Sequence, residues 1–146
     1  MPTHTDITIT EVVSKQQRRT FVEFPLSLYR DCPLYVPPLL AEEIDALTPG
    51  KNPAFTVGQA RLYLAYRSGQ LVGRVAAILS LPANKKNKAR NVRFGWFDCI
   101  DDYEVARALF NAVEAWAREL GMETISGPHG FDLFDKAGML IEGFDQ

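Results

Sequence analysis

The chain has 146 residues, of which 47% are hydrophobic and 23% are charged, enough for one globular domain with its own core. Its formal net charge of −2 argues against a protein dedicated to nucleic acids or anionic membranes. Two cysteines, Cys32 and Cys99, are too few for a disulfide framework, and no apolar run approaches the roughly 20 residues of a membrane helix. We therefore expect a cytoplasmic protein with reduced thiols.

Hydrophobic periodicity and turn residues divide the chain into strands and helices. Ile7 to Val13 alternates β-branched and polar residues, which is typical of a half-buried strand. Ser14 is a suitable N-cap for the next helix, and Pro25 is expected to kink or split it. The remaining pattern predicts helices over 15–29 and 39–47, strands over 60–67 and 71–79, a polar loop over 82–90, a strand over 92–100, a short strand over 123–126 and a short helix over 131–137.

The stretch from Val92 to Leu120 organises the chain, because a strand runs through a tight turn into a long amphipathic helix. Asp101 is the predicted N-cap of this helix, and Glu104 three residues later completes a capping box. One stripe of large side chains is expected to pack on the sheet: Val105, Leu109, Val113, Trp116 and Leu120. Backbone N–H groups at the start of such a helix suit an anionic ligand.

Four residues around this turn carry reactive or ligating groups, and each has a structural alternative. Cys99 precedes the helix N-terminus, where its pKa can be lowered, but a small buried core thiol also fits. Asp98, Asp101 and Asp102 resemble an acidic metal cluster, whereas the capping role explains Asp101 without a metal. We expect no metal site here.

The two histidines and the basic loop give weaker signals. His4 lies in the N-terminal tail and His129 in a loop that includes Gly127 and Gly130, and neither has a second histidine or a nearby serine that would form a triad. Lys85, Lys86, Lys88 and Arg90 suit either a phosphate or plain solvent, and the acidic net charge favours solvent. We expect no nucleic-acid partner.

Several short phrases carry a family resemblance. They are 35–39 (YVPPL), 51–55 (KNPAF), 72–78 (VGRVAAI), 94–102 (FGWFDCIDD), 127–131 (GPHGF) and 138–145 (GMLIEGFD). Together they resemble the GNAT superfamily, which transfers acyl groups from acyl-coenzyme A to amines, and within it a branch of large bacterial N-acetyltransferase-like proteins. The resemblance covers most of residues 20–146, and proteins of this branch normally continue well past the position of Gln146.

The resemblance implies an α/β fold with a mixed, mostly antiparallel sheet and helices on both faces. It implies a single domain over residues 1–146 that forms the N-terminal portion of a longer protein, incomplete at its C-terminus. The implied cofactor is acetyl-coenzyme A, with its pantetheine arm on the main chain of Phe97, Asp98 and Cys99. The pyrophosphate would rest on the backbone amides near Tyr103. The catalytic residues and the acceptor amine are not identified by the motifs.

Two departures from the family pattern weaken the implied cofactor site. The superfamily's coenzyme A loop usually reads Arg/Gln-x-x-Gly-x-Gly/Ala, but residues 100–106 (IDDYEVA) contain no glycine and no basic residue. The tyrosine that often protonates the leaving thiolate is absent, because that region offers Phe131 and Phe134. We expect weak acetyl-coenzyme A binding by this segment.

Two functions therefore remain open. The first is an acyl-coenzyme A-dependent N-acyltransferase, of which this segment forms one half, a degenerate one. The alternative is a GNAT-shaped structural or substrate-binding module without catalysis. In either case the apolar tail over 139–144 predicts a homodimer or a contact with a C-terminal half.

Overall fold

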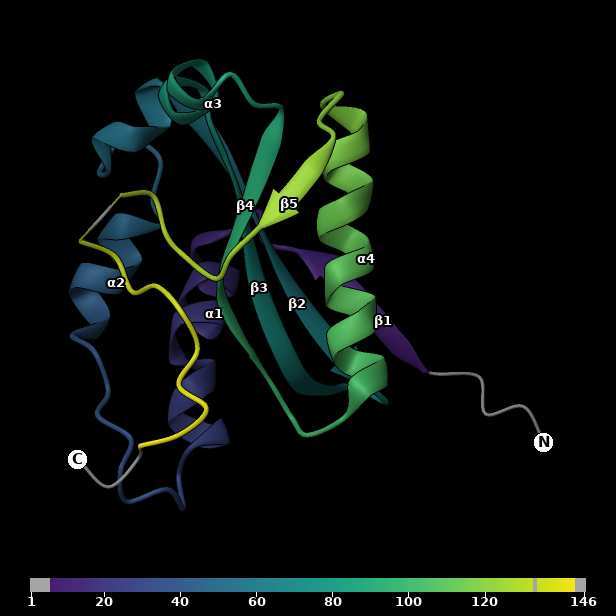
Figure 1. Cartoon of the computed structure of the whole chain (residues 1–146). Helices are drawn as coiled ribbons and strands as arrows, with labels where there is room; N and C mark the ends of the chain where they lie inside the picture. Colours follow the sequence, from purple (N-terminus) through teal and green to yellow (C-terminus); the bar gives the residue numbers. More distant parts are fainter. Residues whose placement is uncertain (1–5, 133, 144–146) are drawn as a thin grey trace.

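The computed structural model describes residues 6–132 and 134–143 and shows a five-stranded sheet with helices on both faces (Figure 1). The strands are β1 (Ile7–Glu11), β2 (Gly58–Arg67), β3 (Gln70–Ser80), β4 (Asn91–Cys99) and β5 (Thr124–Ser126). The helices are α1 (Lys15–Leu28), α2 (Leu40–Ala46), α3 (Leu81–Asn87) and α4 (Tyr103–Glu119), with the short 3-10 helix η1 (Pro53–Thr56). Strands β1 to β4 pair antiparallel in chain order, and β5 pairs parallel with β4. The predicted mixed, mostly antiparallel architecture is confirmed.

Helix α4 covers one face of the sheet through the predicted stripe. The first four of its five members are buried, and the last is partly buried at the end of the helix: Val105, Leu109, Val113, Trp116 and Leu120. The predicted helical phase is therefore confirmed. Gly73 of β3 permits this close approach, because a Cβ there would lie 2.9 Å from the Cδ1 atom of Leu109. Strand β3 is covered on both sides along residues 75–79, as its apolar run predicted.

Helices α1 and α2 cover the opposite face, where Phe21, Val22 and Leu47 pack on β2 and β3. Ser14 caps α1 and forms a capping box with Gln17. The helix is not split at Pro25 and runs as one element from Lys15 to Leu28. Proline has no N–H to donate to the carbonyl four residues earlier, so an external donor must satisfy that group if the helix is to continue.

Two further local predictions were wrong. The predicted loop over 82–90 contains helix α3, because the Ser80 hydroxyl accepts from the Ala83 N–H and Pro82 lies in the first turn, where no N–H is needed. The predicted helix over 131–137 is absent from its described residues. There the Asp135 side chain accepts from the N–H of Phe131, and such local bonds compete with helix formation.

In the described part of the chain, no helix combines the length and the apolar character that crossing a membrane requires.

Candidate functional site

The site begins with a bulge in strand β4. Arg74 of β3 is paired with Asp98 and Ala76 with Gly95, so two steps along β3 oppose three steps along β4. The extra residue falls at Trp96–Phe97, and Trp96 has a left-handed backbone with φ of 47°. A bulge re-aims the side chains around it. It places Trp96 and Asp98 on the face covered by α1 and α2, and Phe97 on the face covered by α4.

Strands β4 and β5 diverge next to this bulge (Figure 1). They pair only from Asn91 with Thr124 to Arg93 with Ser126. The loop after β5 then crosses β4, where the N–H of His129 donates to the carbonyl of Phe94 over 2.9 Å. The contact is so close that a Cβ at Gly95 would lie 2.4 Å from the His129 carbonyl oxygen. From Trp96 to Cys99 this edge of β4 has no partner strand among the described residues.

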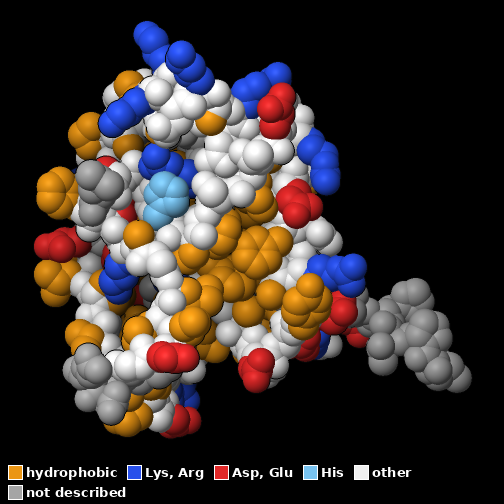
Figure 2. Space-filling model, in the orientation of Figure 1, with side chains coloured by type: hydrophobic (Ala, Val, Ile, Leu, Met, Phe, Trp, Pro, Cys, Tyr) orange, Lys and Arg blue, Asp and Glu red, His pale blue; other side chains and the backbone are white. Residues whose placement is uncertain are grey.

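The four predicted cofactor residues do not present their side chains together. The ring of Phe97 packs against Phe110 and Phe94 at centroid distances of 4.8 and 6.4 Å. Cys99 lies half-buried on the same face, and burial, followed by nearby carboxylates, raises its thiol pKa, as expected of a core thiol. Tyr103 starts α4 with its side chain 79% exposed. Hydrophobic side chains gather on this face between β4 and α4 (Figure 2).

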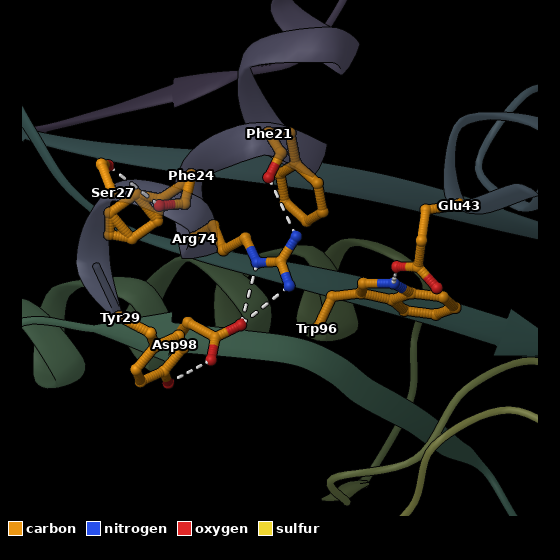
Figure 3. Close-up of polar contacts among 8 residues, drawn as sticks. All are labelled: Phe21, Phe24, Ser27, Tyr29, Glu43, Arg74, Trp96 and Asp98. Atoms are coloured by element: carbon orange, nitrogen blue, oxygen red, sulfur yellow. Dashed lines mark hydrogen bonds and ion pairs between the residues drawn. The ribbon is translucent and has the colours of Figure 1, made fainter. Parts of the chain in front are cut away.

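Asp98 belongs to a buried polar cluster on the other face (Figure 3). Arg74, only 6% exposed, donates from Nε and Nη2 to Asp98 Oδ2 over 3.0 and 2.8 Å. The Tyr29 hydroxyl donates to Asp98 Oδ1 over 2.5 Å, and burial together with this carboxylate raises the Tyr29 pKa. Arg74 Nη1 also donates to the carbonyl of Phe21 over 2.9 Å. In a regular helix the N–H of residue 25 would donate to this carbonyl, but Pro25 has no N–H. Arg74 supplies the missing hydrogen bond, which lets α1 continue through Pro25.

This cluster was missed from the sequence. Its one local signal was a single arginine inside the apolar strand from Leu71 to Leu79. A buried arginine in such a run requires a carboxylate, but nothing nearby in the sequence indicates that the partner is Asp98, 24 residues away.

A second polar contact holds α2 to the bulge. The indole Nε1 of Trp96 donates to Glu43 Oε2 over 2.6 Å (Figure 3). The other side of the indole meets Phe131 at a centroid distance of 5.8 Å, edge-on. Tyr35 packs on Tyr29 at 4.7 Å in the preceding segment. Residues far apart in the sequence therefore lie around the side chain of Trp96, the bulged residue, on this face.

The start of α4 differs from its prediction. Asp102, not Asp101, is the N-cap, and its Oδ1 accepts from the N–H of Glu104 over 2.9 Å. Its Oδ2 pairs with Arg67 Nη1 at 2.5 Å, and this partner from β2 decides which aspartate turns inward. Arg67 lowers the pKa of Asp102, with the helix amides adding to the shift. Asp101 is exposed. The predicted coenzyme A loop over residues 100–106 therefore does have a basic neighbour, Arg67, but Asp102 already pairs with its charge.

The remaining candidates do not assemble into a metal site. The described residues contain no group of three histidine, cysteine or acidic side chains placed to share an ion. Asp98 is turned to Arg74 and Asp102 to Arg67 on separate faces. Burial and then the nearby Arg93 lower the pKa of His129, which favours its neutral imidazole. His4 lies outside the described residues.

Comparisons with solved structures identify the fold. No protein-family model matches the chain. A tandem GNAT protein from the clavulanic acid biosynthesis pathway matches with a TM-score of 0.61 and 17% identity, over 84% of this chain and 39% of its own. A predicted acetyltransferase from Clostridium acetobutylicum, solved with acetyl-CoA, matches with a TM-score of 0.59 and 12% identity, over 85% and 81%. The chain has the fold of the GNAT acetyltransferases.

Two bacterial proteins are similar in sequence. Protein YghO of Escherichia coli (strain K12) is 38% identical over 133 residues, which cover 91% of this chain and 34% of that protein. The bacterial ceramide synthase of Caulobacter vibrioides (strain NA1000 / CB15N) is 33% identical over 144 residues, 98% of this chain and 38% of that protein. The chain therefore spans little more than a third of the length of these curated relatives.

Proposed function

We propose that this chain forms the acyl-donor side of an N-acyltransferase that makes an amide from an acyl-coenzyme A and an amine. The observation that carries the proposal is the free edge of β4 from Trp96 to Cys99, beside a bulge, in a GNAT fold. An unpaired strand edge binds an extended, amide-containing arm through its main chain, whatever side chains it carries. The pantetheine arm of coenzyme A is such a chain, so the predicted roles of Phe97, Asp98 and Cys99 remain as main-chain contacts.

The relatives extend this proposal to a substrate class. A ceramide is an amide of a long-chain amino alcohol, and one relative is named a ceramide synthase. We propose amide formation on a small-molecule amine of lipid character for this protein too. Partly buried rings next to the free edge, those of Phe94, Phe97 and Phe110, provide apolar surface that suits a long acyl group.

The alternative function is a GNAT-shaped binding module without catalysis. The start of α4 favours it, because Asp102 occupies an N–H group there and Arg67 is already paired. In this position a pyrophosphate must compete with a carboxylate for the same donors and meet the charges of Asp101 and Glu104. Catalysis would then require parts of the longer relatives that this chain does not cover.

Calorimetric titration of acetyl-coenzyme A into this chain tests the cofactor site. We expect a Kd weaker than about 100 µM, because the pyrophosphate gains little at α4. Asp102→Asn keeps a capping oxygen, removes the charge and frees Arg67, so it should tighten binding about tenfold. Asp101→Asn, at the exposed neighbour, is the matched control and should change the Kd less. Micromolar binding that neither substitution alters would contradict this view of α4.

The same titration into a full-length relative, such as protein YghO, separates the two functions. Binding together with amide formation from an acyl-coenzyme A and a long-chain amine would support the enzyme. Binding without amide formation for any amine would favour the module.

A cytoplasmic location is also part of this proposal. The free thiols of Cys32, which is exposed, and Cys99, which is half-buried, support it, since free thiols persist in a reducing compartment.

A further inference from the structure

Glu43 is an anionic group without a matching cation. Seven ion pairs are present in the described part of the chain, and none of them includes Glu43. Its carboxylate is half-buried and held in place by the indole N–H of Trp96 over 2.6 Å. A fixed carboxylate that is partly removed from water favours a positively charged partner.

Aromatic side chains lie around this carboxylate. The Trp96 ring contacts it directly. Burial raises the pKa of the Tyr35 hydroxyl, Arg74 opposes this shift, and the charges of Asp98 and then Glu43 add to it. Tyr29 stacks on Tyr35. Aromatic faces attract cations, and a carboxylate with aromatic neighbours is the usual composition of an ammonium site.

Glu43 also lies close to the free edge of β4, where an ammonium site would serve the proposed reaction. Trp96 is the bulged residue, so one indole side chain separates the Glu43 carboxylate from the main chain at which β4 and β5 diverge. In the proposed function, the acyl thioester ends at that main chain. Helix α2, which carries Glu43, covers the opposite side of the sheet from Phe97 and α4, and this inference places the second substrate on that side.

We propose that Glu43 binds the protonated primary amine of the acceptor and takes its proton, an inference that rests on the function proposed above. The carboxylate accepts one proton from the ammonium and leaves a neutral amine. The nitrogen lone pair forms a C–N bond to the thioester carbonyl carbon, and the C–S bond breaks. The thiolate leaves with the bonding electron pair and is protonated by the nitrogen-bound proton that the amide loses, directly or through water.

Asp98 is the other carboxylate on this face, and it is unsuited to the role. Arg74 occupies its Oδ2 with two hydrogen bonds, and Tyr29 occupies its Oδ1. Its charge is therefore neutralised and its oxygens are engaged. Asp98 positions α1 and Tyr29, whereas Oε1 of Glu43 has no hydrogen-bond partner among the described residues.

The indole N–H resonance of Trp96 gives a direct test by NMR. n-Octylamine, protonated at pH 7, is titrated into the 146-residue chain, and n-octanol serves as the uncharged control of equal chain length. Trp116, buried on the opposite face, is the internal reference, and Trp96→Phe assigns the signal. We expect a saturable shift of the Trp96 signal with the amine, little with the alcohol, and none at Trp116.

Substitutions in α2 test whether the charge of Glu43 is responsible for amine binding. Glu43→Gln keeps an acceptor for the indole and should weaken amine binding at least about tenfold. Glu43→Asp keeps the charge and should retain part of the affinity, which guards against a folding defect. Glu42→Gln, at the exposed neighbour in the same helix, should have no effect.

Three outcomes would overturn the inference. They are an equal shift with octanol, undiminished amine binding in Glu43→Gln, and no Trp96 shift at millimolar amine in a folded chain. If acetyl-coenzyme A binds while the amine does not, this inference fails and the proposed acyl-donor site remains.

Discussion

Replacing Arg74 by methionine tests whether one guanidinium holds strand β3, strand β4 and helix α1 together. Methionine keeps the apolar stem and removes the charge. The change leaves two groups without their partner, the Asp98 carboxylate, whose side chain is 17% exposed, and the carbonyl of Phe21. Removing one member of a buried ion pair costs about 3–5 kcal/mol. We expect the free energy of unfolding to fall by an amount in that range.

A second substitution separates the two contributions. Pro25→Ala restores the backbone N–H that can bond to Phe21 within the helix. An unsatisfied buried carbonyl costs about 1–3 kcal/mol, so Arg74→Met should cost less by about that amount in the Pro25→Ala background. Asp98→Leu in addition to Arg74→Met should recover part of the loss, because no buried charge is then unpaired.

The assay is urea denaturation at pH 7, followed by far-UV circular dichroism, with the m-value compared between variants. Arg61→Met is the control, since Arg61 pairs with Glu11 and Glu119 at the surface, where a change of about 0–1 kcal/mol is expected. A loss below about 1 kcal/mol for Arg74→Met, or an equal loss with and without Pro25, would refute the reasoning.

Three further predictions follow from residues described above. Trp116→Ala should cost about 3–5 kcal/mol in the same denaturation assay, and a loss below about 1 kcal/mol would contradict the burial of Trp116 between α4 and the sheet. The exposed side chains of Met139, Leu140 and Ile141 should make the isolated chain dimerise or precipitate, and light scattering that shows a stable monomer over a concentration series would argue against this. The imidazole of His129 should titrate below 6.5 by NMR, because burial and Arg93 lower its pKa. His129 then binds a proton more readily in the unfolded chain than in the folded one. Its contribution to the free energy of unfolding is therefore complete above pH 6.5 and is lost as the pH falls below that value. An NMR midpoint above 6.5 would contradict the burial of this ring.

Features set by neighbouring residues were predictable from the sequence. The stripe from Val105 to Leu120 follows from helical spacing, and the Ser14 cap follows from residue type. The cap of α4 was misplaced by one residue because Asp101 and Asp102 are equivalent in local sequence, and only Arg67 from β2 distinguishes them. Helix α3 was missed because its proline, Pro82, and its lysines, Lys85 and Lys86, are equally typical of a loop.

Features that join distant segments were not predictable. The Arg74–Asp98 pair and the Trp96–Glu43 hydrogen bond depend on the register of β3 with β4 and on the bulge in β4. A single extra residue in a strand exchanges the faces of all later side chains, and hydrophobic alternation does not locate it when aromatic residues occur on both faces. The acceptor side of the candidate site therefore became visible only in three dimensions.

The loop after β5, where it crosses β4, also limits the length of the free edge of β4. At one end, Gly95 lies against the main chain of His129, and at the other end β4 runs into the turn before α4. The free edge between them has four residues, Trp96 to Cys99, which at about 3.3 Å per residue measures about 13 Å. An extended partner can align with β4 only over this distance. Any longer partner must bend away at the loop, so the fold itself selects the reach of the molecule that lies along it.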